Sequence, residues 1–405
     1  MKILFVISKY YPKIGGTQGC VRNIAKTIKK DHDVQILTTW DKMTDPSEVL
    51  CDGIRVHKVR SYKHIALGDF LKAENVSAFR RFAAVLKKAM HRIFRLEDKA
   101  LEKQFAKRLK KLQESENFDW VVAVSGDIVP AKAVLSSKKL LRNICFYQLD
   151  PYTTNTTLPL SSQDKRCELE KKIHESFDLI FTTDIIKNEM SERFTLGDNV
   201  RVCNFPTIVD RTNKEEKPSG EEISFLYCGA MYSARNADFC LGVMDEMTRL
   251  DPRFVFDFYI VGDTSGVKSY SEKNPRILLH PPVSPDKIHG IMSDHDVLIN
   301  IGNVMTNQVP SKVYDYISTG LPIVNFIQND NCPTVEVLEK YPTALTVSSK
   351  ESKESAAAYI SAFISQKLGQ RVEYPLIEKL YLENTVTYVA DMMVSNMLRQ
   401  ESGSI

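Results

Sequence analysis

The chain has 405 residues, and its 54 basic and 51 acidic side chains give a net charge of +3. One hydrophobic core rarely serves more than about 250–300 residues, so this length predicts two domains. No stretch approaches the roughly 20 apolar residues that span a bilayer. Residues 1–8 are too short an apolar run for a secretory signal, and the eight cysteines form no C-x-x-C pair. We therefore expect a cytoplasmic protein without disulfides or a zinc site.

Short runs rich in Val, Ile and Phe alternate with amphipathic stretches of helical length, a pattern typical of parallel sheets. The first series of predicted strands comprises Ile3–Ser8, Val34–Thr38, Ile54–Val59, Trp120–Val124, Ile144–Gln148 and Leu179–Thr183. The second comprises Phe225–Cys228, Phe256–Val261, Ile277–Leu279, Val297–Asn300 and Ile323–Phe326. The pattern predicts an α/β protein with two Rossmann-like parallel-sheet domains.

A polar stretch without apolar periodicity, 210–222, separates the two series and predicts the linker. The first domain would then span 1–209 and the second 223–375. The remaining stretch, 376–405, has a helical pattern, and we expect a helix that can pack back on the first domain.

The segment 72–111 carries 13 basic against four acidic side chains. Apolar residues recur at helical spacing from Phe79 to Ile93 while basic residues fill the other face, which predicts basic amphipathic helices. Such helices suit an anionic membrane surface, where each basic side chain contributes about 1 kcal/mol. A core helix with a solvated basic face fits the pattern as well. No aromatic stacking pattern accompanies the charge, so we expect no nucleic acid partner.

Ligands of open parallel sheets bind at the carboxyl ends of the strands, so the segments after the predicted strands are the candidate sites. After the first strand, Gly15 and Gly16 precede a helical run and would let the backbone approach a phosphate, although a plain turn has the same residues. The dinucleotide fingerprint G-x-G-x-x-G is absent there. After the first strand of the second domain, Arg235 is placed to reach an anion, or else it lies on the surface.

A third segment begins with Pro310 and Ser311, which favour a helix start, and ends at Gly320. Lys312 falls in the first turn, where a basic side chain opposes the helix dipole, and this suggests a negative ligand. Asp315 follows one turn later, where a carboxylate would accept hydrogen bonds from ribose hydroxyls. The segment therefore predicts an anion site.

Four features, in this order, resemble the retaining GT-B glycosyltransferases of family four (glycosyltransferase group 1). That group includes sucrose synthase-like enzymes and enzymes of bacterial polysaccharide and glycolipid biosynthesis. The features are the opening strand with Pro12 and Gly15-Gly16, the Gly229–Arg235 loop, Val261-Gly262-Asp263, and P-S-K-x-x-D-Y-x-x-x-G-x-P-I-V at 310–324. The resemblance covers most of the chain. It implies a GT-B fold whose two domains face a central cleft, with the nucleotide in the second domain and the acceptor in the first.

The resemblance implies a retaining, metal-independent hexosyl transfer, without a cofactor, from a UDP- or GDP-sugar to a saccharide or lipid-linked acceptor. The enzyme would act in the cytoplasm or peripherally on the inner membrane face. Gly16 would contact the diphosphate, and Arg235 and Lys312 would neutralise it as it leaves. Asp315 would hold the ribose. The other donor-binding residues would be Gly15, Asn307, Ser311 and Val283, the last in the loop His280–Val283 near the base.

The chain departs from the family pattern at two positions. Ala230 stands where many members carry an arginine, which leaves Arg235 and Lys312 with more of the charge. Asn307 stands where many carry the first glutamate of an E-x7-E motif, and Asp315 takes the place of the second. The change at Asn307 leaves the identity of the donor sugar open.

Two acidic patterns bear on the mechanism. The D-x-D triplets at 31–33 and 294–296 precede strands and lie at the edge opposite the expected site, so we expect no bound metal. Asp150 follows the strand that ends at Gln148 and is a candidate for orienting the acceptor, or an Asp-Pro turn residue.

Two other functions stay open at this stage. A nucleotide-sugar epimerase of the same architecture would bind the same donor without a second substrate. A catalytically lapsed GT-B partner would bind nucleotide or membrane and support another transferase, as the changes at Ala230 and Asn307 allow. Donor turnover separates the lapsed partner from an enzyme, and an epimeric product identifies the epimerase.

Overall fold

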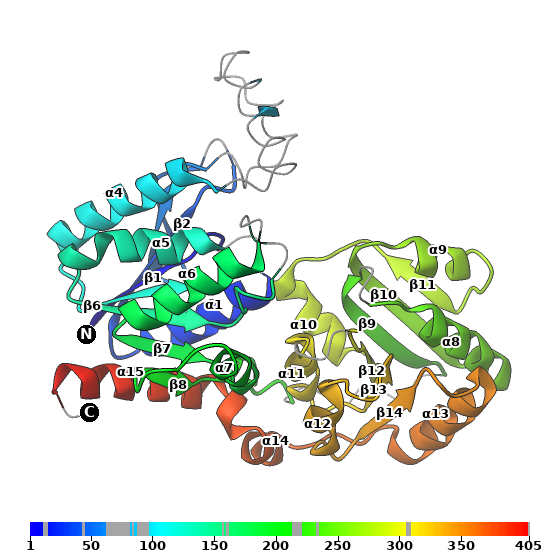
Figure 1. Cartoon of the computed structure of the whole chain (residues 1–405). Helices are drawn as coiled ribbons and strands as arrows, with labels where there is room; N and C mark the ends of the chain where they lie inside the picture. Colours follow the sequence, from blue (N-terminus) through cyan, green and yellow to red (C-terminus); the bar gives the residue numbers. More distant parts are fainter. Residues whose placement is uncertain are drawn as a thin grey trace. The chain divides into compact units, whose positions relative to one another are not determined.

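A computed structural model describes most of the chain. It describes residues 1–10, 15–42, 45–61, 82, 85–86, 97–155, 158, 162–212, 221–231, 235–304 and 309–403. The chain forms two compact units, one made of Met1–Pro206 with Val386–Ile405 and the other of Thr207–Thr385. Each unit has helices on both faces of a parallel sheet (Figure 1). The α/β fold with two parallel-sheet units is confirmed.

The first unit contains an eight-stranded sheet among its described residues, in the order β3-β4-β2-β1-β5-β6-β7-β8. All neighbouring strands are parallel except β3, which is antiparallel to β4. The strands are β1 (Lys2–Val6), β2 (Asp33–Thr39), β3 (Glu48–Cys51), β4 (Ile54–Val59), β5 (Trp120–Val124), β6 (Asn143–Gln148), β7 (Leu179–Thr182) and β8 (Val200–Val202). The strand order reverses between β1 and β5, where ligands of such sheets bind.

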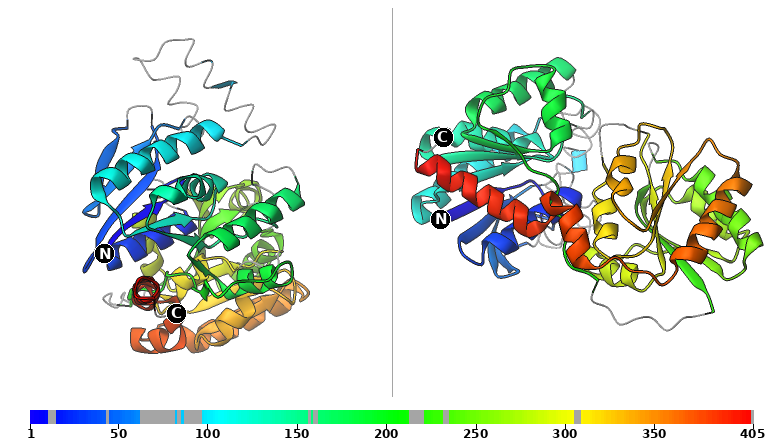
Figure 2. Two further views of the ribbon diagram at one scale, coloured as in Figure 1. Left: turned by 60° about the vertical axis from the view of Figure 1, so that its left-hand side comes forward. Right: turned by 90° about the horizontal axis from the view of Figure 1, so that it is seen from below.

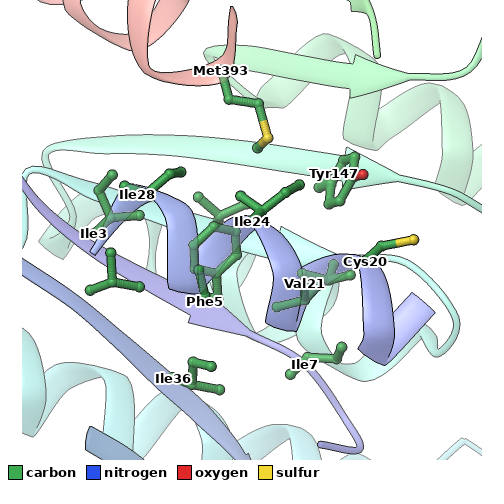
Figure 3. Packing of buried hydrophobic residues seen from close by; sticks show 14 of the residues in the cluster. Ile3, Phe5, Ile7, Cys20, Val21, Ile24, Ile28, Ile36, Tyr147 and Met393 are labelled. Carbon is green, nitrogen blue, oxygen red and sulfur yellow. The ribbon is translucent and has the colours of Figure 1, made fainter. Parts of the chain in front are cut away.

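Two helices that are far apart in the sequence cover one face of the first sheet. They are α1 (Gly16–Ile28) and α15 (Val386–Glu401), and Figure 3 shows Ile24 of α1 between Phe5 of β1 and Met393 of α15. The other face packs on α4 (Lys99–Glu116), α5 (Ile128–Ser137) and α6 (Gln163–Ser176). The unit also contains α7 (Asp184–Ser191) and the short 3-10 turn Lys138–Leu140. Alternating apolar side chains along the inner strands fill both faces, as expected for a covered parallel sheet.

The second unit contains a six-stranded, fully parallel sheet in its described part, in the order β11-β10-β9-β12-β13-β14. Its strands are β9 (Ile223–Met231), β10 (Phe254–Gly262), β11 (Ile277–His280), β12 (Val297–Ile301), β13 (Ile323–Ile327) and β14 (Ala344–Ser348). Read in chain order this is 3-2-1-4-5-6, the order of doubly wound nucleotide-binding sheets. The order reverses between β9 and β12.

Helices cover both faces of the second sheet (Figures 1 and 2). One face packs on α8 (Asp238–Leu250), α9 (Ser265–Ser271) and α13 (Lys353–Lys367) through a continuous apolar core. On the other side lie α10 (Pro285–Ser293), α11 (Lys312–Ile317) and α12 (Thr334–Glu339). The unit ends with α14 (Tyr374–Leu380) and the 3-10 turn Leu382–Asn384.

The C-terminal stretch, expected as one helix over 376–405, is divided between the units. Residues up to the 3-10 turn belong to the second unit, because Tyr381 donates a hydrogen bond to Val337 O at 2.7 Å and Asn384 O accepts from the backbone of Ile208 at 3.0 Å. The second unit therefore extends to Thr385 rather than 375, and it starts at Thr207 rather than 223. Helix α15 then packs on the first unit, where Trp120 donates to Glu401 at 2.8 Å.

Most of the basic segment 72–111 and of the linker 210–222 lies outside the described residues. The described part of the basic segment includes α4, which begins at Lys99 with Asp98 accepting from Leu101 N. The apolar face of α4 is in the core of the first unit, through Phe105, Leu109 and neighbours. Within the described ranges no helix combines the length and hydropathy that a membrane crossing requires.

Candidate functional site

The carboxyl ends of β9 and β12 mark the reversal of strand order in the second sheet. The two strands pair through Phe225–Val297 and Leu226–Leu298, near their amino ends, whereas β9 continues to Met231. The carboxyl ends are therefore not joined by the ladder, and this is where a ligand of a doubly wound sheet binds.

Arg235 lies at this reversal point. Its Nε and Nη2 donate to Asn303 Oδ1 at 3.0 and 2.7 Å, and its Nη1 donates to Ala230 O at 3.0 Å. Asn303 follows β12, and Ala230 is the last residue but one of β9. The guanidinium therefore bridges the two diverging strands. Tyr227 also donates to Ala230 O, at 2.9 Å. The arginine is thus held in the protein rather than extended into solvent, with 8% of its surface exposed.

A cluster of charged side chains surrounds Asp315 on α11. Its carboxylate lies 3.2 Å from Lys312 Nζ, 3.0 Å from Arg211 Nη1 and 3.8 Å from His289 Nε2. Burial by itself would raise the pKa of Asp315, but Lys312, Arg211 and His289 outweigh it and hold the pKa below its ordinary value. Burial likewise opposes the charge of Lys312, and Asp315 reverses this and raises the lysine's pKa. Both groups are therefore ionised at neutral pH.

The charges of this cluster do not cancel. Arg211 and Lys312 contribute two positive charges and Asp315 one negative charge, before any protonation of His289. The Cys228 thiol on β9 is within electrostatic range of both Lys312 and Asp315, so the cluster lies beside the same strand that leads to Arg235. A local excess of positive charge at the carboxyl edge suits a phosphate or diphosphate group.

Helix α11 is fixed against β9 by Tyr316. The tyrosine hydroxyl accepts from Cys228 N at 3.1 Å and donates to Cys228 O at 3.0 Å. Ser311 precedes Lys312 as the N-terminal cap, and the helix is six residues long, shorter than the stretch to Gly320 expected from the sequence. Gly320 adopts φ +76°, and a Cβ there would lie 2.5 Å from Val372 O, so a side chain does not fit. The helix itself ends at Ile317 with Ser318 as its C-cap, so the stop expected at Gly320 is placed too late.

Val283 lies in the loop between β11 and α10, two strands away from β9. His280, the last residue of β11, pairs with Asp257 at 2.5 Å and stacks on Tyr259 with ring centroids 4.6 Å apart. The His280 side chain thus contacts residues of the neighbouring strand β10. The assignment of Val283 to the base remains a prediction.

In the first unit, Asp150 lies beside the first turn of α1. Thr17 donates to its Oδ2 at 3.2 Å, and a Cβ on Gly126 would lie 3.7 Å from the same oxygen. Gly15 and Gly16 stand at the start of α1, where Gly15 N donates to Gln18 Oε1 at 2.9 Å. Burial raises the pKa of Asp150, and the hydrogen bond from Thr17 opposes this only in part. The first sheet thus places Gly15, Gly16 and a carboxylate with a raised pKa at its own reversal point.

The turn that carries Asp150 is tied down on both sides. Ser125 Oγ accepts from the backbone N–H groups of Leu149 and Asp150 at 2.8 and 3.0 Å. Glu170, which is 1% exposed, accepts from Tyr152 N at 2.8 Å and Thr153 N at 3.0 Å. Asp150 is thus held in a fixed Asp-Pro turn, and its role toward an acceptor stays a prediction.

The structure places Lys312 and Asp315 on α11, with Ser311 as its N-cap, and Arg235 is held at Ala230 and Asn303. Sequence reasoning missed three of their partners, namely Arg211, His289 and Asn303. Asn303 had a usable signal, since it comes three residues after the predicted strand Val297–Asn300. Asn307 and Pro12 lie outside the described residues.

The acidic triplets lie at the opposite edge of the sheets. Asp296 accepts from the N and Oγ of Ser224 at 2.8 and 2.7 Å, at the amino end of β9. Among the described residues no group of three or more His, Cys, Asp or Glu side chains is arranged to hold a metal ion.

Comparison with known proteins identifies the fold. No family model and no curated protein matches the sequence. Sucrose-phosphate synthase from Thermosynechococcus elongatus is 11% identical with a TM-score of 0.66, and the match covers 100% of both chains. A trehalose-6-phosphate protein of E. coli bound with UDP-2-fluoro glucose is 10% identical with a TM-score of 0.63, over 98% of this chain and 99% of the other.

A third solved structure with this fold has a different reaction. UDP-GlcNAc 2-epimerase from Methanocaldococcus jannaschii is 12% identical with a TM-score of 0.58, over 98% of this chain and 99% of its own. Similarity at these identities establishes architecture. The chain has the GT-B fold, as the sequence predicts.

Proposed function

We propose that the chain is a glycosyltransferase that moves a sugar from a nucleotide diphosphate donor, a UDP- or GDP-sugar, to a saccharide or lipid-linked acceptor. The observation that carries this proposal is the excess of positive charge from Arg211 and Lys312 around Asp315, beside the reversal point where Arg235 is held. The fold supports it, since solved GT-B structures include a sucrose-phosphate synthase and a protein bound with UDP-2-fluoro glucose.

In the proposed reaction the sugar–phosphate bond breaks and negative charge develops on the departing diphosphate. Arg235 and Lys312 would stabilise that charge, which is the largest contribution fixed groups can make to such a reaction. Asp315 would orient Lys312 and accept from the ribose, with Ser311 and Asn307 as further donor contacts. We propose retention of the anomeric configuration and no requirement for a metal, by resemblance to the family named above.

A screen for donor binding and turnover tests the function. We expect one of UDP, GDP, ADP or TDP, or its sugar conjugate, to raise the melting temperature of the purified protein, equally in magnesium and in EDTA. The same conjugate should then release free nucleotide diphosphate when an acceptor mixture is added. Absence of both effects for every donor would contradict the proposal and favour the lapsed partner. Stabilisation lost in EDTA would contradict the metal-independent form.

On the acceptor side we propose that Asp150 orients the acceptor hydroxyl, with Gly15 and Gly16 beside it. Because burial raises its pKa, Asp150 would be protonated at acid pH and would lose the negative charge with which it holds the acceptor hydroxyl, so kcat/KM should rise with pH through a value above 3.8. This rise of kcat/KM with pH, the acid limb of the profile, should disappear in Asp150→Asn, together with most of the activity. If the residual activity of Asp150→Asn still fell at acid pH as in the wild type, the pH dependence would belong to another group. Glu170→Gln is expected to lower kcat without removing the limb.

The epimerase remains the second candidate, because a UDP-GlcNAc 2-epimerase shares the fold over nearly the whole chain. Incubation of the donor alone decides between them. Recovery of the sugar as an epimer without any acceptor identifies the epimerase, whereas an acceptor-dependent product identifies the transferase.

We also propose that the enzyme works in the cytoplasm at an anionic membrane surface that presents the acceptor. On the described helix α4 the exposed side chains include Lys99, Lys103, Lys107, Lys110 and Lys111. Because the apolar face of α4 is in the core, the contact would be electrostatic and would weaken with salt. Binding to phosphatidylglycerol vesicles that is unaffected by salt, or no binding at low salt, would contradict this part.

A further inference from the structure

Asn303 fixes the plane of the Arg235 guanidinium. Its single oxygen Oδ1 accepts from both Nε and Nη2, at 3.0 and 2.7 Å. These two donors form one edge of the planar guanidinium, so one acceptor that takes both restricts the rotation of the whole group. Asn303 itself is 1% exposed, and it has little freedom to follow a moving arginine.

The loop that carries Asn303 is in turn held from the neighbouring strand. Gln328 Nε2 donates to Gly302 O at 2.6 Å, and Asn329 Nδ2 donates to Asn303 O and Val304 O at 3.2 and 3.1 Å. Three consecutive carbonyls at the end of β12 are therefore bound by two amides that follow β13. The approach is close, because a Cβ on Gly302 would lie 2.7 Å from Cys332 Sγ.

From these contacts we propose that Asn303 is a positioning residue that orients Arg235 toward the diphosphate, and that Gln328 and Asn329 fix Asn303 in turn. This inference rests on the proposed function. The amide is an uncharged acceptor, so it orients the guanidinium without adding a negative charge to the site. An aspartate has the same shape and can accept from the same donors, but it would place a negative charge about 3 Å from the guanidinium, and this charge would weaken the attraction of the arginine for a phosphate.

Asn303→Asp tests the proposal because it should weaken pyrophosphate binding without lowering the stability of the fold. The affinity for inorganic pyrophosphate, measured by calorimetric titration, should fall about 10-fold or more, since a charge-assisted hydrogen bond contributes about 1.5–3 kcal/mol. The kcat for the donor identified by the screen should fall with it. The melting temperature should stay level or rise, because the new carboxylate pairs with Arg235. A residue that only supports the fold would not lower affinity while stability is kept.

The exposed neighbour Asn236 provides a matched control. Its Oδ1 accepts from Asp238 N at 2.7 Å, which a carboxylate also does, so Asn236→Asp adds the same charge next to Arg235 in the sequence without replacing its acceptor. We expect wild-type affinity and turnover from this variant. Asn329→Ala should keep the charge unchanged and lower kcat about 3- to 10-fold, an effect at the lower end for a residue that acts through another.

The outcomes separate the inference from the function on which it rests. If the wild type consumes a nucleotide sugar and Asn303→Asp binds pyrophosphate and turns over as well as the wild type, the role of Asn303 is refuted and the function stands. If the wild type neither binds pyrophosphate nor consumes any donor, both are refuted. Should Asn303→Asp fail to fold, Asn303→Ala gives the same decision through kcat, because it removes the orienting oxygen without adding charge.

Discussion

Replacing Arg235 with alanine should lower donor turnover about 100- to 1,000-fold while the protein stays folded, an effect typical of removing one fixed group from a developing negative charge. The guanidinium donates to Asn303 and Ala230 at the carboxyl edge, beyond the strand ladder, so its loss should leave the second sheet intact. Initial rates of nucleotide diphosphate release, compared with circular dichroism and thermal melting of the same samples, measure both effects.

Two further arginine variants make this result specific. Arg235→Lys keeps the charge but cannot present two donors to Asn303 Oδ1, so it should restore only part of the rate. Arg253→Ala removes an exposed arginine of the same unit that pairs with Asp251, and it should leave turnover unchanged. Wild-type turnover in Arg235→Ala would end the assignment of Arg235 to the leaving diphosphate.

The second large effect is expected from Asp315→Asn. This change leaves Lys312, Arg211 and His289 around an uncharged amide, and we expect it to cost about 2 kcal/mol of stability, or several degrees in the melting temperature. Because an anion can take the place of the lost carboxylate, inorganic phosphate should stabilise the variant more than it stabilises the wild type. Donor turnover should fall as well, through loss of the ribose contact.

Salt and pH provide the controls for this second prediction. Sodium chloride at matched ionic strength should not reproduce the effect of phosphate, and Asp330→Asn, which breaks an exposed pair with Lys350, should show no phosphate rescue. The folded pKa of Asp315 lies below 3.8, so its stabilising contribution is complete above that pH and is lost as the pH falls through the lower folded value. The difference between wild type and variant should therefore vanish in acid. A variant as stable as the wild type at neutral pH would show that the cluster is not held by Asp315.

The buried strands could be predicted from the sequence almost to the residue. Trp120–Val124 has the same ends in the structure, because a strand covered on both faces needs an unbroken apolar run, and Ile54–Val59 also has the same ends through its alternating apolar residues. The strands that were missed are β3, β8 and β14, which lie at the edges of their sheets and are partly exposed. An edge strand pairs with a neighbouring strand on one side only and stays partly exposed. It therefore does not need the apolar run by which a buried strand is recognised.

The candidate site could be predicted where its residues share one short segment. Lys312 and Asp315 are three residues apart on one helix, so their spacing alone places them together. Arg211 and His289 reach the same carboxylate from a segment read as linker and from α10, and no local pattern connects them. Asn303 could be nominated by its place after β12, but its bond to Arg235 depends on how far the ends of β9 and β12 separate.

The packing of α15 on α1 has a consequence for how the protein is made. The apolar face of α1 and β1 is completed by Val389, Ala390, Met393 and Met397, and Arg201 donates to Asn396 at 3.1 Å. On a ribosome these residues are synthesised after the whole of the second unit. The first unit therefore waits with an uncovered apolar face while the second can already fold, and a fragment ending at Pro206 should aggregate unless the last helix is supplied as a peptide.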